Sequence, residues 1–237
     1  RDLGSALISH EETDQVILTG AYETAELFRS MRPDLPLLAE TSGKNALIVT
    51  PSADLDLAAR DAAVSAFGHA GQKCSAASLV ILVGSVATSK RFHRQFLDAV
   101  SSMHVGMPWD ERAQIGPVIA APEGKLQQGL TTLGPGENWV LQPQQLNDEG
   151  TLWRPGVRAG VQPGSEYHLT EYFGPITGIM TAETLEEAIV MANQVEYGLT
   201  AGLHSLDEDE INTWLASIQA GNLYVNRGIT GAIVQRQ

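Results

Sequence analysis

Residues 79–83 (LVILV) form an uninterrupted apolar run that is typical of a parallel β-strand covered on both faces. Residues 46–50 form a second apolar run, and residues 89–103 place aromatic and aliphatic side chains at helical spacing. Between the two apolar runs, residues 58–67 are rich in alanine, as expected for a packed helix. Strands and helices that alternate in this way predict an α/β domain in which helices cover a mostly parallel sheet.

Cys74 is the only cysteine in the chain and lies between the predicted helix and the strand at 79–83. A single cysteine cannot form a disulfide within its own chain, so it is either a small buried side chain or a reactive thiol. Gly68 and Gly71 end the helix, which places Cys74 in a loop beside Lys73, whose positive charge favours the thiolate. Cys74 is therefore a candidate nucleophile, and an inert thiol is the alternative.

Glu40 is a second candidate for a chemical role. It follows an apolar run at 35–39 and precedes Cys74 by about one strand–helix crossover unit, which can bring two such residues together. A thiol that attacks a carbonyl and a carboxylate that activates water would together support covalent catalysis. A solvated or helix-capping Glu40 is the alternative.

Four short motifs resemble those of the aldehyde dehydrogenase superfamily and stand in the family's order. Residues 40–45 (ETSGKN) are similar to its glutamate motif, and residues 67–76 (FGHAGQKCSA) are similar to its cysteine motif. Residues 171–176 (EYFGPI) and 221–226 (GNLYVN) resemble two further motifs. Because four motifs occur in order, the resemblance is much more specific than any one of them.

The resemblance implies a three-layer αβα catalytic domain with a mostly parallel sheet, in which Cys74 is the nucleophile and Glu40 the base. It covers nearly all of this chain but only about half of a complete enzyme. It divides the chain into residues 1–38, the end of an NAD-binding domain, and residues 39–225, the catalytic domain. Residues 226–237 would then begin a truncated C-terminal segment that anchors the substrate.

The family resemblance also implies NAD as cofactor. In related enzymes the carboxylate at the position of Glu171 binds the nicotinamide ribose, and the aromatic ring at Phe173 lies beside the nicotinamide. Gly20 belongs to a turn that opens a helix facing the pyrophosphate, where unpaired backbone N–H groups bind anions. The chain departs from the family pattern here, with Ala21 in place of a serine and Ala25 in place of a glycine.

Residues 226–234 (NRGITGAIV) resemble the substrate-anchoring loop of the Δ1-pyrroline-5-carboxylate dehydrogenases. The resemblance implies that the backbone at Gly231 and Ala232, with the Ser75 hydroxyl, holds the α-carboxylate of glutamate γ-semialdehyde. Backbone N–H groups and a hydroxyl can form such an anion-binding concavity. A simple glycine turn is the alternative interpretation of the loop.

Several alternatives for the parent protein remain open at this stage. The regions around Cys74 and Gly231 are also similar to the dehydrogenase half of bifunctional proline utilisation proteins. The parent could act on a different semialdehyde, or use the fold without catalysis. His69, close to Cys74, also allows a cysteine–histidine hydrolase.

We expect the 237-residue chain alone to be inactive. Family members carry an oxyanion-binding asparagine in a segment that would precede Arg1. They also carry a Pro-Phe-Gly-Gly stretch that would follow Gln237 and that helps to line the substrate pocket.

Composition excludes several other function classes. The net charge of −13 and pI near 4.8 oppose binding to nucleic acid or to an anionic membrane. No apolar run is long enough to span a bilayer, and no secretory leader is evident, so we expect a cytoplasmic protein. The six histidines show no ligand spacing, and no metal site is predicted. Family members form dimers or larger assemblies, which implies a homo-oligomer with a small aldehyde as substrate.

Local patterns predict further elements. They are a buried strand at 16–19, helices at 22–31, 184–193 and 207–219, strands at 199–204 and 223–225, and a polar surface connection at 142–158.

Overall fold

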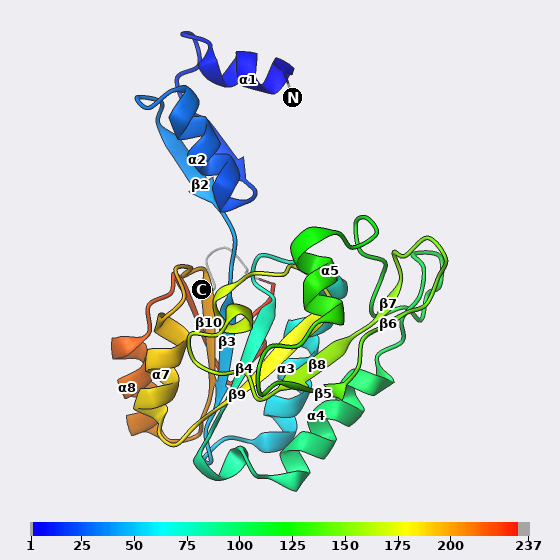
Figure 1. Cartoon of the computed structure of the whole chain (residues 1–237). Coiled ribbons are helices and arrows are strands. Elements are labelled where there is room, and N and C mark those ends of the chain that lie inside the picture. The colour runs from blue at the N-terminus through cyan, green and yellow to red at the C-terminus, as the bar shows by residue number, and fades with distance from the viewer. Residues whose placement is uncertain (1, 232–237) are drawn as a thin grey trace. The chain divides into compact units, whose positions relative to one another are not determined.

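The structure is a computed structural model that describes residues 2–231, and it consists of two compact units (Figure 1). The first unit ends at Ser42, and the second begins at Gly43. The second unit contains most of the secondary structure, and Cys74 lies in a loop of this unit.

The first unit contains α1 (Asp2–Ser9), β1 (Val16–Thr19), α2 (Tyr22–Met31) and β2 (Leu37–Glu40). β1 and β2 pair in parallel, with Thr19 opposite Glu40. The predicted strand at 16–19 and helix at 22–31 are confirmed, but the prediction that β1 is buried is wrong. Ile17 is 79% exposed, because a sheet of two strands and one packed helix leaves alternate residues uncovered within this unit.

The second unit is built on a seven-stranded sheet with the order β11-β10-β3-β4-β9-β8-β5. Every neighbouring pair is parallel except β5 and β8. The strands are β3 (Asn45–Val49), β4 (Ala77–Val83), β5 (Asn138–Leu141), β8 (Gly156–Ala159), β9 (Ile176–Ala182), β10 (Thr200–His204) and β11 (Asn222–Val225). A short hairpin of β6 (Gln144–Gln145) and β7 (Trp153–Arg154) lies outside this sheet.

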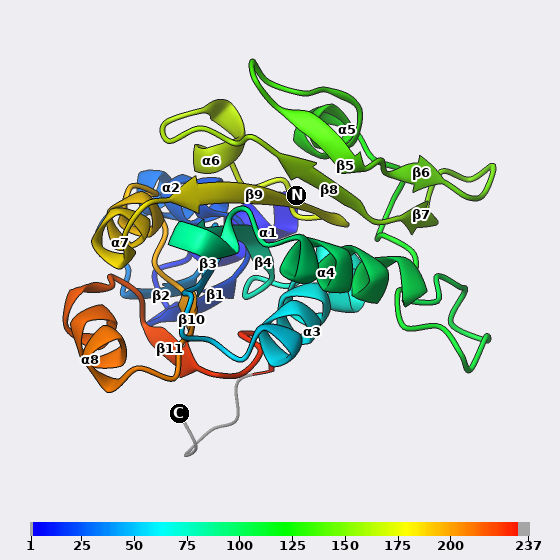
Figure 2. The ribbon, with the colours of Figure 1, turned by 90° about the horizontal axis from the view of Figure 1, so that it is seen from below.

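Helices cover both faces of the sheet, as Figure 2 shows from below. On one face, Leu47 and Val49 of β3 share a core cluster with residues of α3 (Leu55–Phe67) and α4 (Lys90–Ser102). On the other face, Ala46 and Ile48 share a cluster with residues of α7 (Leu185–Asn193) and α8 (Glu208–Ser217). The side chains of β3 alternate between the two cores, and all five residues are buried. The predicted three-layer αβα class with a mostly parallel sheet is therefore confirmed.

The helix at 207–219 and the strand at 199–204 are confirmed to within two residues at each end. The interpretation of residues 142–158 as a surface connection is wrong for its last part, because residues 156–158 belong to β8 and are buried. Arg158 of β8 is 2% exposed and pairs with Glu137 at 2.7 Å. Because a charged residue stands at this buried position, the sequence of β8 lacks the apolar pattern by which a buried strand is predicted. The structure also contains α5 (Gly124–Thr131) and α6 (Glu166–Leu169), which the pattern does not predict.

Candidate active site

Three loops with chemically active residues come before three neighbouring strands. Gly43 and Lys44 precede β3, residues 68–76 precede β4, and residues 171–175 precede β9. Because these strands are adjacent and parallel, their amino ends meet at one edge of the sheet. We call these three segments the amino edge. Ligands of open α/β sheets usually bind at the opposite, carboxyl ends of the strands, so this placement of reactive residues is unusual.

The side chain of Asn45 fixes the loop that carries Cys74. Its Nδ2 donates to the carbonyl oxygens of Cys74, at 2.7 Å, and Ala76, at 3.0 Å. Its Oδ1 accepts a hydrogen bond from the backbone N–H of Thr200, at 3.1 Å, at the start of β10. Asn45 is 3% exposed, and in this way its amide connects β3 to its neighbour β10 and to the loop before β4. The sequence places Asn45 in a motif but does not indicate this role.

Gly43 lies against the same loop. A Cβ atom at Gly43 would overlap the carbonyl oxygen of Cys74, so only glycine permits this approach. The Gly43 N–H donates to Glu171 Oε1 at 2.8 Å. The structure therefore brings both Glu171 and the Cys74 loop against one glycine.

The backbone between α3 and Cys74 is strained. His69, Ala70 and Gly71 all have positive φ, at 55°, 56° and 66°. Alanine and histidine rarely adopt this left-handed conformation, which costs about 1–3 kcal/mol per residue and is found mainly at functional sites. A Cβ at Gly71 would overlap the carbonyl oxygen of Gly174, so the turn packs directly on residues 171–175.

Gln72 connects the strained turn to two further loops. Its Nε2 donates to the Phe173 carbonyl at 3.1 Å, and its Oε1 accepts from the Ile119 N–H at 2.9 Å. Phe173 has a φ of 53° and a ring that is 38% exposed. Cys74 and Ser75, the next residues after Lys73, are half-buried. The predicted site residues Cys74, Ser75, Glu171 and Phe173 thus all belong to the amino edge.

Lys44 of the amino edge belongs to a cluster of buried cations and aromatic rings. Lys44 is 2% exposed, and its Nζ lies 3.9 Å from the ring centre of Tyr167. The Arg158 guanidinium lies 4.0 Å from the centre of the same ring. Burial, together with the nearby charge of Arg158, holds the pKa of Lys44 well below its ordinary value. The sequence pattern does not indicate this role of Lys44, because a lysine next to a glycine in a loop normally lies in solvent.

Glu40 and Gly20 lie together in the first unit. Glu40 ends β2, is exposed, and accepts a backbone hydrogen bond from the Gly20 N–H at 3.1 Å. Since Cys74 belongs to the second unit, the pairing of Glu40 with Cys74 remains a prediction.

The predicted substrate-anchoring residues follow β11. Gly231 has a φ of 80°, a conformation that favours glycine, and it is the last residue that the structure describes. Ala232 lies outside the described residues. An open hollow of about 590 Å³ is lined by His69, Gln72 and Lys73 of the amino edge and by Thr230. The loop after β11 and the Cys74 loop therefore border one space.

Within residues 2–231, the His, Cys, Asp and Glu side chains form no group of three or more that could hold a metal ion. Across the same residues, every helix is too short or too polar to cross a membrane.

Comparison with known proteins adds independent findings. The sequence profile of the Aldehyde dehydrogenase family matches residues 1–237. A 1-pyrroline-5-carboxylate dehydrogenase of Geobacillus sp. (strain WCH70) is 32% identical over 245 residues, covering 100% of this chain and 47% of the relative. The chain thus spans about half the length of the curated relatives that it matches.

Two solved structures have the same fold. The structure of Proline Utilization A (PutA) from Corynebacterium freiburgense matches with a sequence identity of 57% and a TM-score of 0.96. The match covers 99% of this chain and 24% of that protein. A 1-pyrroline-5-carboxylate dehydrogenase from Thermus with bound NAD matches with a sequence identity of 33% and a TM-score of 0.88. The match covers 98% of this chain and 46% of that protein.

Proposed function

Because the chain belongs to the aldehyde dehydrogenase family, we propose that the full-length protein oxidises an aldehyde to a carboxylate and uses Cys74 as its nucleophile. The observation that carries this proposal is the construction of the amino edge. Asn45 clamps the Cys74 loop on one side, and Gly71 packs it against residues 171–175 on the other. Strain and close packing around a half-buried thiol are what a pre-organised nucleophile requires.

The proposed substrate is glutamate γ-semialdehyde, the open form of Δ1-pyrroline-5-carboxylate, which places the reaction in proline breakdown. Relatives named for this substrate support the proposal. So does the loop after β11, which borders the same hollow as the Cys74 loop. We propose that Gly231, Ala232 and Ser75 hold the α-carboxylate of the substrate.

In the proposed mechanism, the Cys74 thiolate adds to the aldehyde carbon and forms a thiohemiacetal, with its oxyanion held by the Cys74 backbone N–H. Loss of hydride from the same carbon leaves a thioester on Cys74. Glu40 then takes a proton from a water molecule that attacks the thioester. The carboxylate product leaves, and the thiol of Cys74 is restored.

The proposed oxidant is NAD, which supplies the chemistry of hydride acceptance when it is bound. The described residues fit its nicotinamide ribose end. Glu171 is half-buried, and its Oε1 accepts the Gly43 N–H. Since the carboxylate is also partly exposed to solvent, it can accept hydrogen bonds from the ribose hydroxyls. Phe173 presents a partly exposed ring next to it. Gly20, at the turn before α2, is the proposed contact for the pyrophosphate.

Three further parts of the proposal concern the whole protein. Residues 1–38 would complete an NAD-binding domain, residues 39–225 would form the catalytic domain, and residues 226–237 would begin the anchoring segment. The chain alone would not turn over substrate, and the full-length protein would form a homo-oligomer.

The test is NADH formation by the full-length protein with Δ1-pyrroline-5-carboxylate, compared with propanal. Cys74→Ala should abolish the reaction, whereas Ser85→Ala, an exposed serine just beyond the carboxyl end of β4, should leave it unchanged. Faster turnover of propanal would keep the chemistry and reject the substrate. Failure to oxidise any aldehyde would favour a non-catalytic use of the fold.

A further inference from the structure

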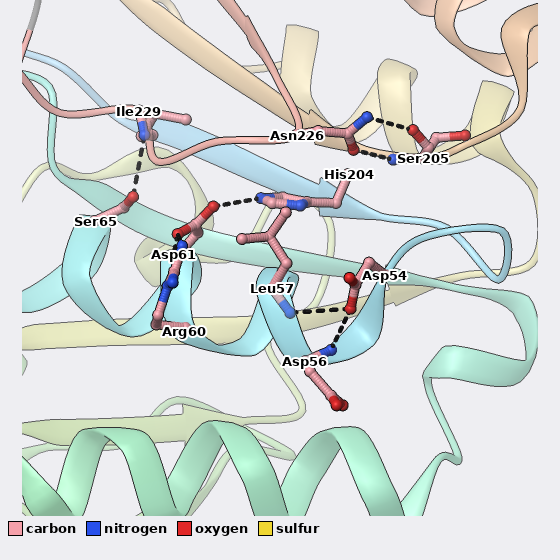
Figure 3. A network of polar contacts seen from close by, with 10 residues as sticks. All are labelled: Asp54, Asp56, Leu57, Arg60, Asp61, Ser65, His204, Ser205, Asn226 and Ile229. Atoms are coloured by element: carbon pink, nitrogen blue, oxygen red, sulfur yellow. Dashed lines mark hydrogen bonds and ion pairs between the residues drawn. The ribbon is translucent and has the colours of Figure 1, made fainter.

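The loop that follows β11, residues 226–231, is fastened to the domain at its first residue. Asn226 has a φ of 54°, and its backbone N–H donates to the Leu203 carbonyl at 2.9 Å. Its side-chain Oδ1 accepts from the Ser205 N–H at 3.0 Å, while its Nδ2 donates to the Ser205 carbonyl at 2.7 Å. These bonds fix the start of the loop to the carboxyl end of β10, and Figure 3 shows the two that join Asn226 to Ser205.

A second attachment lies three residues further on, at Ile229. The Ile229 side chain is fully buried, and a Cβ at Gly202 of β10 would overlap its Cγ2 atom. Its backbone N–H donates to the hydroxyl of Ser65 at 3.0 Å. Ser65 lies on α3 and is itself fully buried, so its hydroxyl satisfies an amide that has no access to water.

Gly228 permits this contact. A Cβ built at Gly228 would lie 3.0 Å from Ser65 Oγ, closer than a normal carbon–oxygen contact. The loop can therefore approach α3 closely enough for the Ser65 hydroxyl to reach Ile229. Figure 3 shows Ser65 pointing at the Ile229 amide. Asp61, about one turn earlier on α3, faces His204 of β10.

The hydrogen bond of Ser65 joins two segments that border the candidate site. α3 ends at Phe67 and leads directly into the strained turn and Cys74. Ile229, on the other side of the bond, comes two residues before Gly231. One buried hydroxyl thus joins the helix before the nucleophile to the loop proposed to hold the carboxylate.

We propose that Ser65 is a positioning residue, which sets the distance between the carboxylate-binding loop and the thiol of Cys74. This inference rests on the proposed function. If it holds, removal of the hydroxyl loosens the loop and weakens binding of an aldehyde that carries an α-carboxylate. An aldehyde without a carboxylate does not use the loop and is not affected.

The experiment compares Ser65→Ala with Ser89→Ala in the full-length protein. Ser89 is a matched control, because its hydroxyl also accepts one backbone N–H, from Phe92 at 3.3 Å, but in the cap of α4. Ser65→Ala should speed amide hydrogen exchange in residues 226–231 and raise the KM for Δ1-pyrroline-5-carboxylate by about tenfold, the effect of one lost buried hydrogen bond. Its kcat, and its kinetics with propanal, should stay within about twofold of wild type. Ser89→Ala should change none of these quantities.

Gly228→Ala provides a second variant that disturbs the same contact from the loop side. The added methyl group presses on Ser65 Oγ, so the same rise in KM for the carboxylate substrate is expected without a change inside α3.

The outcomes separate the two proposals. Unchanged exchange in Ser65→Ala would overturn the positioning role, whatever the substrate. Equal losses with both aldehydes would also overturn it, because they would show a purely structural effect on the Cys74 loop. A wild-type protein that does not oxidise Δ1-pyrroline-5-carboxylate would reject the proposed function and, with it, the role of Ser65 in positioning the loop for that carboxylate.

Discussion

The two ends of the strands in the central sheet are built in opposite ways. At the amino edge, the backbone at His69 and Ala70 is left-handed, and glycines at 43 and 71 are in contact with neighbouring carbonyl groups. At the carboxyl ends of β3 and β10, hydroxyl groups satisfy a single carboxylate. The hydroxyls of Thr50, Ser52 and Ser205 each donate to Glu210 Oε2 at 2.6 Å.

We call this second group, Thr50, Ser52, Ser205 and Glu210, the carboxyl cluster. Burial raises the pKa of Glu210, but the three hydroxyl bonds outweigh burial and keep the pKa below its ordinary value. The comparison shows that one sheet carries strained backbone at one end and fully bonded polar groups at the other. Residues of the amino edge should therefore affect activity most, and residues of the carboxyl cluster should affect stability most.

The largest effect should come from the nucleophile itself. Cys74→Ala in the full-length protein should lower kcat by at least about 10⁴-fold, because nothing replaces the covalent step. Its melting temperature should stay near that of wild type, since the side chain is only half-buried. Steady-state kinetics and thermal unfolding on the same preparation check both points. A large fall in melting temperature would contradict the division between the two ends.

Asn45→Ala should produce the next largest effect. Two carbonyls and the Thr200 N–H lose their partner, and the Cys74 loop shifts. A displacement of about 1 Å can reduce kcat by about 100-fold. The buried unsatisfied groups should also lower the free energy of unfolding by about 1–3 kcal/mol. Kinetics combined with urea unfolding measures the two changes. A loss of stability alone would mean that the clamp does not position Cys74.

Glu210→Gln tests the other end of the sheet. The variant keeps the shape of the side chain but replaces the carboxylate by one neutral acceptor oxygen and one NH2 donor, so the free energy of unfolding should fall by about 1–2 kcal/mol. The kcat should stay within about twofold, because the carboxyl cluster follows the carboxyl ends of β3 and β10, whereas the amino edge precedes the strands. Urea unfolding and kinetics again give the comparison. A strong loss of kcat would show that the two ends are coupled.

The smallest effect concerns two buried histidines. His168 precedes the residues 171–175 and accepts from the Gly164 N–H with Nδ1, so its Nε2 must carry the proton that it donates to the Met191 carbonyl. His204 ends β10 and faces Asp61 at 3.6 Å. Burial lowers the pKa of both rings, partly opposed by the Met191 carbonyl at His168 and by Asp61 at His204.

The direction of the pH dependence follows from these lowered values. The unfolded chain, with a histidine pKa of about 6.5, binds more protons than the folded protein just below that pH. Stability should therefore be full above about pH 6.5 and decrease as the pH falls below it. A decrease of a few degrees in melting temperature is expected from pH 7.5 to pH 5.5, and His168→Gln should reduce it. A melting temperature that rises over this interval would contradict the assignment.

The sequence predicts the central strands well, because β3 and β4 are continuous apolar runs between helices with capping residues such as Asp54. It does not predict β8, whose buried Arg158 depends on a distant partner, Glu137. The family motifs in the sequence also identify Cys74, Glu171 and Phe173 as candidate site residues. The role of Asn45 could not be predicted, since it depends on Thr200, 155 residues further along the chain.

The long reach of Asn45 has a consequence for how the protein is made on the ribosome. Its amide meets the Cys74 loop after only 29 residues, but it meets Thr200 after 155. At about 5–20 residues per second, β10 is synthesised roughly 8 to 30 seconds after β3. During that interval β3 has one unpaired edge, and the clamp on the Cys74 loop is incomplete. The nascent chain must therefore be protected from β-strand aggregation until β10 emerges.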